Sequence, residues 1–79
     1  MSVAEDLADA LAKDVIDAVE ALDDVDLIDQ VAKQLGASSQ TTQEAFMTAV
    51  RVRLAEKRAR KFLETRLARA LAQAKNTSE

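Results

Sequence analysis

The sequence predicts an all-α fold, and three features of its composition support this. Proline is absent and glycine occurs once, at Gly36, so the chain has almost no residue that breaks a helix. Alanine, the strongest helix former, occurs sixteen times. The only aromatic residues are Phe46 and Phe62, and a core of small and aliphatic side chains favours close packing of helices. We expect a helical hairpin or three-helix bundle, with two short helices and one long helix at about residues 3–22, 25–35 and 39–75.

The length and composition predict a single small domain over residues 1–75, followed by a polar tail at residues 76–79. The apolar share of 48% is too high for a disordered chain of this charge. The acidic start and the lack of a long apolar run predict no secretory signal and no membrane partner, so we expect a cytoplasmic protein. A core this small gives limited stability, and with no cysteine available for disulfides, oligomerisation is the remaining means of support.

The first helix has a clear start and one apolar stripe. Ser2 followed by Glu5 predicts a capping box at its N-terminus. The residues expected to face the core recur every three or four positions: Leu7, Leu11, Val15, Ala18 and Leu22. The acidic cluster after this helix predicts a turn in which Asp24 or Asp26 caps the second helix.

The second helix is expected to end at Gly36, because glycine readily adopts the left-handed conformation that closes a helix. Ser38 is then the natural N-cap of the third helix, and Thr41 with Glu44 offers an alternative capping box. These signals place two turns and divide the chain into three helices.

The long third helix changes character midway, across the charged segment at residues 56–61. Before that segment the apolar residues follow one stripe, and after it they follow another. Either the helix bends there or its two halves serve different partners; without proline or glycine we expect one continuous or gently bent helix. Because it is longer than the other two, part of its apolar surface should be covered by another chain. The predicted partner interface comprises Phe46, Val50, Leu54, Phe62, Leu63, Leu67 and Leu71.

The hairpin segment has a Leu-Ile start, a Val-Ala pair, a glycine and a serine cap, followed by Ala-Phe in the next helix. The residues concerned are Leu27, Ile28, Val31, Ala32, Gly36, Ser38, Ala45 and Phe46. Over residues 27–54 this pattern resembles the N-terminal helical hairpin of HU/IHF-type bacterial DNA-bending proteins. That family binds DNA with β-arms rich in glycine, proline and basic residues, which this chain lacks after Gly36. The resemblance therefore implies a dimerising α-hairpin.

Charge is strongly polarised along the chain. Residues 1–37 carry a net charge of −8 and residues 38–79 a net charge of +5. The cations that could contact phosphates or an acidic partner are Arg51, Arg53, Lys57, Arg58, Arg60, Lys61, Arg66 and Arg69. The competing and favoured interpretation is that these cations are solvated or pair with the acidic half of the protein.

A DNA-reading helix-turn-helix would place its recognition helix near Ser39. Such a helix would present Gln40, Thr41, Gln43 and Glu44 to base edges, but the first basic residue after them is Arg51, so phosphate anchoring would be poor. An ordinary capped turn is the favoured interpretation of this segment.

The residue types needed for most catalysis are missing. There is no histidine, which removes the commonest general base and the commonest metal ligand, and no cysteine, which removes any thiolate site. The acidic cluster at residues 23–29 lacks the glycine and glutamate spacing of a calcium loop, and helix capping accounts for it better. We predict no enzyme, no cofactor, no metal and no small-molecule substrate.

The expected function is a small protein-interaction module, a regulatory or accessory subunit, forming a homodimer or binding another protein. The alternative is a nucleoid-associated or helix-turn-helix-type DNA-binding regulator.

Overall fold

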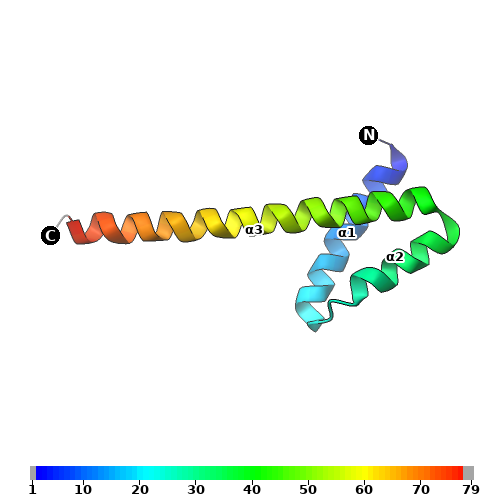
Figure 1. Cartoon of the computed structure of the whole chain (residues 1–79), viewed down its shortest axis with the longest axis horizontal. Helices are drawn as coiled ribbons and strands as arrows, with labels where there is room; N and C mark the ends of the chain where they lie inside the picture. The colour runs from blue at the N-terminus through cyan, green and yellow to red at the C-terminus, as the bar shows by residue number, and fades with distance from the viewer. Residues whose placement is uncertain (1, 78–79) are drawn as a thin grey trace.

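The computed structural model describes residues 2–77, and these form three helices that pack as a bundle (Figure 1). They are α1 (Val3–Leu22), α2 (Leu27–Ser38) and α3 (Gln40–Thr77). The predicted all-α fold is confirmed. Figure 1 shows α1 crossing the first half of α3, while α2 returns from the end of α1 to the start of α3. Of the polar tail predicted at residues 76–79, the first two residues belong to α3 and the last two lie outside the described residues.

The start of α1 follows the sequence prediction. The Ser2 hydroxyl accepts a hydrogen bond from the backbone N–H of Glu5 at 3.1 Å and also donates to the Glu5 carboxylate at 3.2 Å. The helix ends at Asp23, which adopts the left-handed conformation with φ 54° and donates its N–H to the carbonyl of Val19. Aspartate tolerates this conformation better than most residues, so the turn needs no glycine.

The predicted end of α2 at Gly36 is wrong. Gly36 has no positive φ and lies inside the helix, which continues to Ser38. A Cβ built on Gly36 would lie 2.7 to 2.9 Å from the end of the Gln43 side chain, so this glycine instead accommodates close approach of α3. The predicted side-chain cap at the start of α2 is also absent: Asp26 occupies the N-cap position but accepts no hydrogen bond on its side chain.

The cap of α3 is one residue later than predicted, at Ser39. This residue is extended, with φ −155° and ψ 107°, and its hydroxyl accepts from the backbone N–H of Thr42 at 3.1 Å. Its own N–H donates to the carbonyl of Leu35 at 2.8 Å. Ser39 therefore closes α2 and opens α3, which explains why a single residue is enough to reverse the chain.

The core lies where α1 and α2 cover the first half of α3. Its buried residues are Ala8, Ala12, Val15, Ile16, Ala32, Phe46 and Val50. Phe46 is the largest fully buried side chain, at 0% exposure. The stripe predicted for α1 is partly wrong, because Leu7 and Leu22 remain 65% and 68% exposed. The helix is rotated so that alanines face inward, which lets α1 approach α3 closely.

Beyond the bundle, α3 continues as a single straight rod (Figure 1). The molecule measures 63 × 29 × 13 Å, and its radius of gyration is 17.7 Å. A compact chain of this length would have a radius of about 12 Å. The predicted continuity of the long helix through residues 56–61 is confirmed. Its charged residues include an i, i+4 pair in which Arg60 donates to Glu56 at 2.7 Å, and this pair supports the uncovered helix.

Candidate protein-interaction surface

The second half of α3 extends beyond the bundle, and its described residues bury no side chain against α1 or α2. Every residue from 55 to 76 is exposed, a segment called the arm below. At about 1.5 Å per residue, its 22 residues extend roughly 33 Å from the bundle. An isolated helix of this length is only marginally stable in water, but the arm continues a helix already formed in the bundle and avoids the cost of nucleation.

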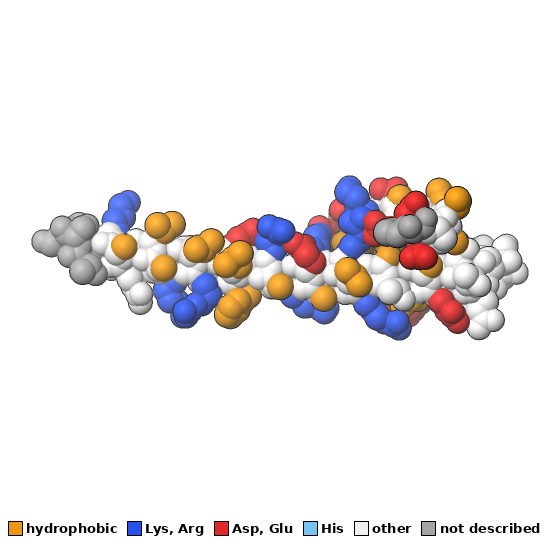
Figure 2. Space-filling view, turned by 90° about the horizontal axis from the view of Figure 1, so that it is seen from above, with side chains coloured by type: hydrophobic (Ala, Val, Ile, Leu, Met, Phe, Trp, Pro, Cys, Tyr) orange, Lys and Arg blue, Asp and Glu red, His pale blue; other side chains and the backbone are white. Residues whose placement is uncertain are grey.

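The arm carries four large apolar side chains that no described residue covers, together called the apolar row: Leu63, Leu67 and Leu71 are spaced four residues apart, and Phe62 lies on another side of the helix. Phe62 is 69% exposed, Leu63 52%, Leu67 54% and Leu71 70%. Figure 2 shows hydrophobic side chains in a row along the arm, with lysine and arginine side chains beside them. A row of this kind on a small protein is typical of a docking surface, whereas single exposed leucines are common everywhere.

The apolar row on the arm does not extend the core face of α3. Eighteen residues make five helical turns, so Glu64 and Ala68 occupy the directions of Phe46 and Val50. The core direction thus continues into a charged and a small residue. Leu63 and Leu67 point about 100° and 60° away from the direction of Phe46, which accounts for the change of stripe at residues 56–61.

The structure divides the predicted partner interface into two groups. Phe46 and Val50 are 0% and 2% exposed in the protein's own core, so they are corrected from interface to core residues. Leu54 is half-buried and packs against the same core. The other four predicted residues are those of the apolar row on the arm.

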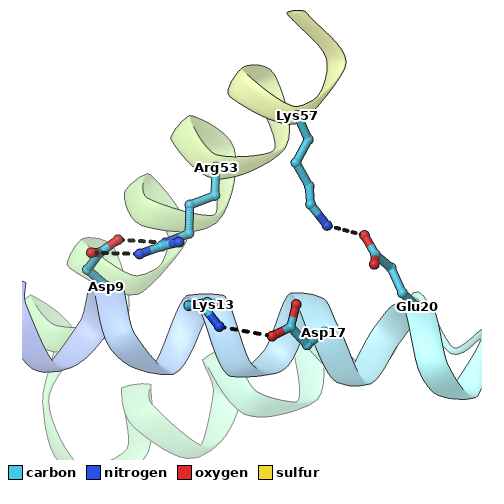
Figure 3. A network of polar contacts seen from close by, with 6 residues as sticks. All are labelled: Asp9, Lys13, Asp17, Glu20, Arg53 and Lys57. Carbon is cyan, nitrogen blue, oxygen red and sulfur yellow. Dashed lines mark hydrogen bonds and ion pairs between the residues drawn. The ribbon is translucent and has the colours of Figure 1, made fainter. Parts of the chain in front are cut away.

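Two of the predicted basic residues pair with the acidic helix α1 (Figure 3). The guanidinium of Arg53 donates two hydrogen bonds to the Asp9 carboxylate, at 2.8 and 2.9 Å. Lys57 forms an ion pair with Glu20. These contacts connect the two charge-polarised halves of the chain, as the favoured interpretation of the basic residues predicted.

The Asp9–Arg53 ion pair shifts the pKa of both groups. Hydrogen bonding from Arg53, with its positive charge, holds the pKa of the Asp9 carboxyl below its ordinary value, against the smaller opposing effect of desolvation. The same hydrogen bonds raise the pKa of Arg53. Within the arm, the hydrogen bond to Glu56 likewise raises the pKa of Arg60. All three groups therefore remain charged around neutral pH, and none is tuned for proton transfer.

The other predicted cations make no ion pair with any residue in the part of the chain that the structure describes. They are Arg51, Arg58, Lys61, Arg66 and Arg69. Most of them lie on the arm, beside its apolar row. The structure therefore leaves a basic and apolar helix surface uncovered.

A shallow groove of about 350 Å³ runs between the start of α1 and the first half of α3. Its floor comes from α3 and consists of small or short side chains, while α1 supplies an acidic edge with Glu5 and Asp9. This groove was not among the features predicted from the sequence. The five-turn relation would have found it: Ala45 and Ala49 lie 18 residues before Leu63 and Leu67, and so on the same side of α3.

Among residues 2–77 there is no cluster of three or more acidic side chains placed to hold a metal ion. No helix in this part of the chain is both long and apolar enough to cross a bilayer. Comparison with protein-family models, curated proteins and solved structures finds no significant match to this chain. The arm and the groove are therefore the features on which a functional proposal can rest.

Proposed function

We propose that this protein is a small non-enzymatic interaction module that binds a protein partner through the apolar row of its arm. The observation that carries the proposal is the exposure of four large apolar side chains, at 52% to 70%, on a helix that extends beyond its own bundle. A soluble domain gains nothing in stability from such a row while it stays in water. Docking on a protein surface would remove these apolar side chains from water and so contribute to binding.

The free energy gained by burying the row is comparable with the lower estimates of the cost of association. Burying one Leu or Phe side chain completely contributes about 1.5–3 kcal/mol. The four side chains still expose between half and about two thirds of their surface. Covering Leu63, Leu67 and Leu71 on one partner face gives a gross gain of about 3–5 kcal/mol, which lies near the lower end of the association cost of about 4–15 kcal/mol. The row thus suits a reversible partner, or a partner that supplies further contacts of its own.

A substitution pair on the arm tests the proposal. Leu67→Glu places a charge in the row, whereas Ala68→Glu places the same charge on an exposed position of the next residue, in the direction of the core face. Both variants should keep the helical circular dichroism of the wild-type chain. Association would be measured by sedimentation of the pure protein and by quantitative capture of partners from source cells. Loss with Leu67→Glu and retention with Ala68→Glu is the expected result; no association in any form, or equal behaviour of the two variants, would contradict the proposal.

The alternative function is DNA binding, and one observation favours it: five cations of α3 have no partner within the described chain. The candidate recognition turn supports it less, since Gln43 is half-buried against Gly36 and is not directed toward a ligand. A mobility-shift titration at low and physiological salt discriminates between the two functions. Affinity that falls steeply with salt would favour DNA binding, whereas the absence of a shift at low salt would remove it.

A further inference from the structure

We infer that a second copy of this chain covers the arm, with the two α3 helices antiparallel and each arm lying along the groove of the other copy. This inference rests on the proposed function and names its partner. A two-fold axis near the middle of the 38-residue α3 would lay each arm along the packed part of the other copy's helix.

The first argument is the match of side-chain sizes along one side of α3. Ala45 and Leu63 point in the same direction, as do Ala49 and Leu67, because each pair is five turns apart. One side of the helix therefore bears small residues in its first half and large residues in its second half. Antiparallel pairing places large residues on small ones at both ends, whereas parallel pairing would set large against large and small against small.

The register follows from the position of the axis. With the axis near residue 58, Leu67 of one copy lies opposite Ala49 of the other, and Leu71 lies opposite Ala45. Leu63 then lies opposite Arg53 and next to Val52, which is 62% exposed although it lies beside the bundle. The groove floor formed by Ala45, Ala49 and Val52 is thus the surface that the row would cover.

The second argument is charge. The arm is basic, and Arg66 and Arg69 make no ion pair with any described residue. In the antiparallel arrangement Arg66, which lies about 60° around the helix from Leu63, approaches the groove with its acidic edge at Glu5. A parallel arrangement would instead set one basic arm against the other. Charge complementarity therefore favours the same orientation as the match of sizes.

The symmetric arrangement also makes the free energy of association more favourable. Two arms are covered in one dimer, while the loss of translational and rotational freedom is incurred once. A second copy therefore supplies the extra contacts that a single arm lacks.

Single-cysteine cross-linking tests the orientation cleanly, since the chain has no cysteine of its own. Ala49→Cys and Leu67→Cys would be prepared separately, mixed, and treated with a short bismaleimide. We expect the mixture to give a covalent dimer several-fold more efficiently than either variant alone. The control mixture pairs Ala49→Cys with Ala68→Cys, whose thiol would point away from the interface, and should cross-link weakly.

Sedimentation equilibrium of the untagged chain at about 1–300 μM supplies a second measurement that needs no cysteine. We expect a monomer–dimer equilibrium, and Leu67→Glu should raise its dissociation constant by about 100-fold or more, because the position is covered twice per dimer. Ala68→Glu should change it little. These variants keep the test decisive if a cysteine variant disturbs the interface.

The outcomes separate this inference from the proposed function. Efficient self-cross-linking of Leu67→Cys would show a parallel pair and overturn the inference, while leaving the arm as an interaction surface. A monomer across the whole concentration range would also overturn it, and the proposed function would then depend on the capture of other proteins. A chain that is monomeric and captures no partner through Leu67 would contradict both.

Discussion

Replacing Phe46 with alanine should remove a large fraction of the protein's stability. Phe46 is the largest fully buried side chain, at 0% exposure, and its neighbours in the core are mostly alanines and valines. Such small residues cannot fill the cavity that the ring would leave, so the full cost of a Phe→Ala change in a core, about 3–5 kcal/mol, is expected. A domain of this size has a total stability of about 4–12 kcal/mol. The substitution therefore removes a large fraction of the stability, and at the lower end nearly all of it.

The same helix provides the matched control. Phe62→Ala removes the same ring from the arm, where 69% of the residue is exposed, and should change the free energy of unfolding by less than about 0.5 kcal/mol. Urea unfolding followed by circular dichroism measures both variants, at a protein concentration where no dimer forms. With a denaturant slope of about 1 kcal/mol/M, Phe46→Ala should lower the midpoint by roughly 3 M. Equal midpoints for the two variants would refute the division of α3 into a core half and an uncovered half.

Three further substitutions test local features of the fold. Ser39→Ala should cost about 1 kcal/mol of stability through loss of the α3 cap, whereas Ser38→Ala should be nearly neutral; equal losses in urea unfolding would contradict the assignment of the cap. Gly36→Ala should raise the urea midpoint, because the residue is helical without positive φ and the side chain it would meet is flexible; a lower midpoint would show that the close contact is rigid. Asp9→Asn should destabilise the protein near pH 6, where the ion pair with Arg53 is intact. Because folding lowers the pKa of Asp9, the contribution of this pair is present above the ordinary carboxyl pKa and is lost as the pH falls through the lowered value, so the gap between wild type and variant should close in acid.

The local signals in the sequence located the helices but misjudged two boundaries. The absence of proline and the capping serine at position 2 fixed α1 closely, because helix starts depend on short-range hydrogen bonds. Gly36 gave a misleading signal: it was interpreted as a helix stop, but the structure uses it to let Gln43 of α3 approach. The sequence cannot distinguish a glycine that ends a helix from one that allows a neighbouring helix to approach, because only the packing of that neighbour differs.

For the candidate surface, periodicity identified the large apolar residues of α3. It could not separate those that lie in the protein's own core from those that stay exposed on the arm. Phe46 and Phe62 look alike in the sequence, and the predicted interface contained both. Their fates differ because α1 and α2 are only long enough to cover the first half of α3. The pairing of Arg53 with Asp9 was likewise predicted only as a contact between the two halves of the chain, since the partner depends on how α1 crosses α3.

The sequence by itself determined the helical class, the three helices and the charge polarity, because these depend on residue propensity, short-range caps and composition. The tertiary structure alone decided which side of each helix is covered, which ion pairs form and where the bundle ends. Those properties depend on the crossing of helices distant in sequence, and a helix with two differently directed apolar faces allows more than one crossing. The rotation of α1 that places Ala8 and Ala12 inward and leaves Leu7 outside is the clearest example.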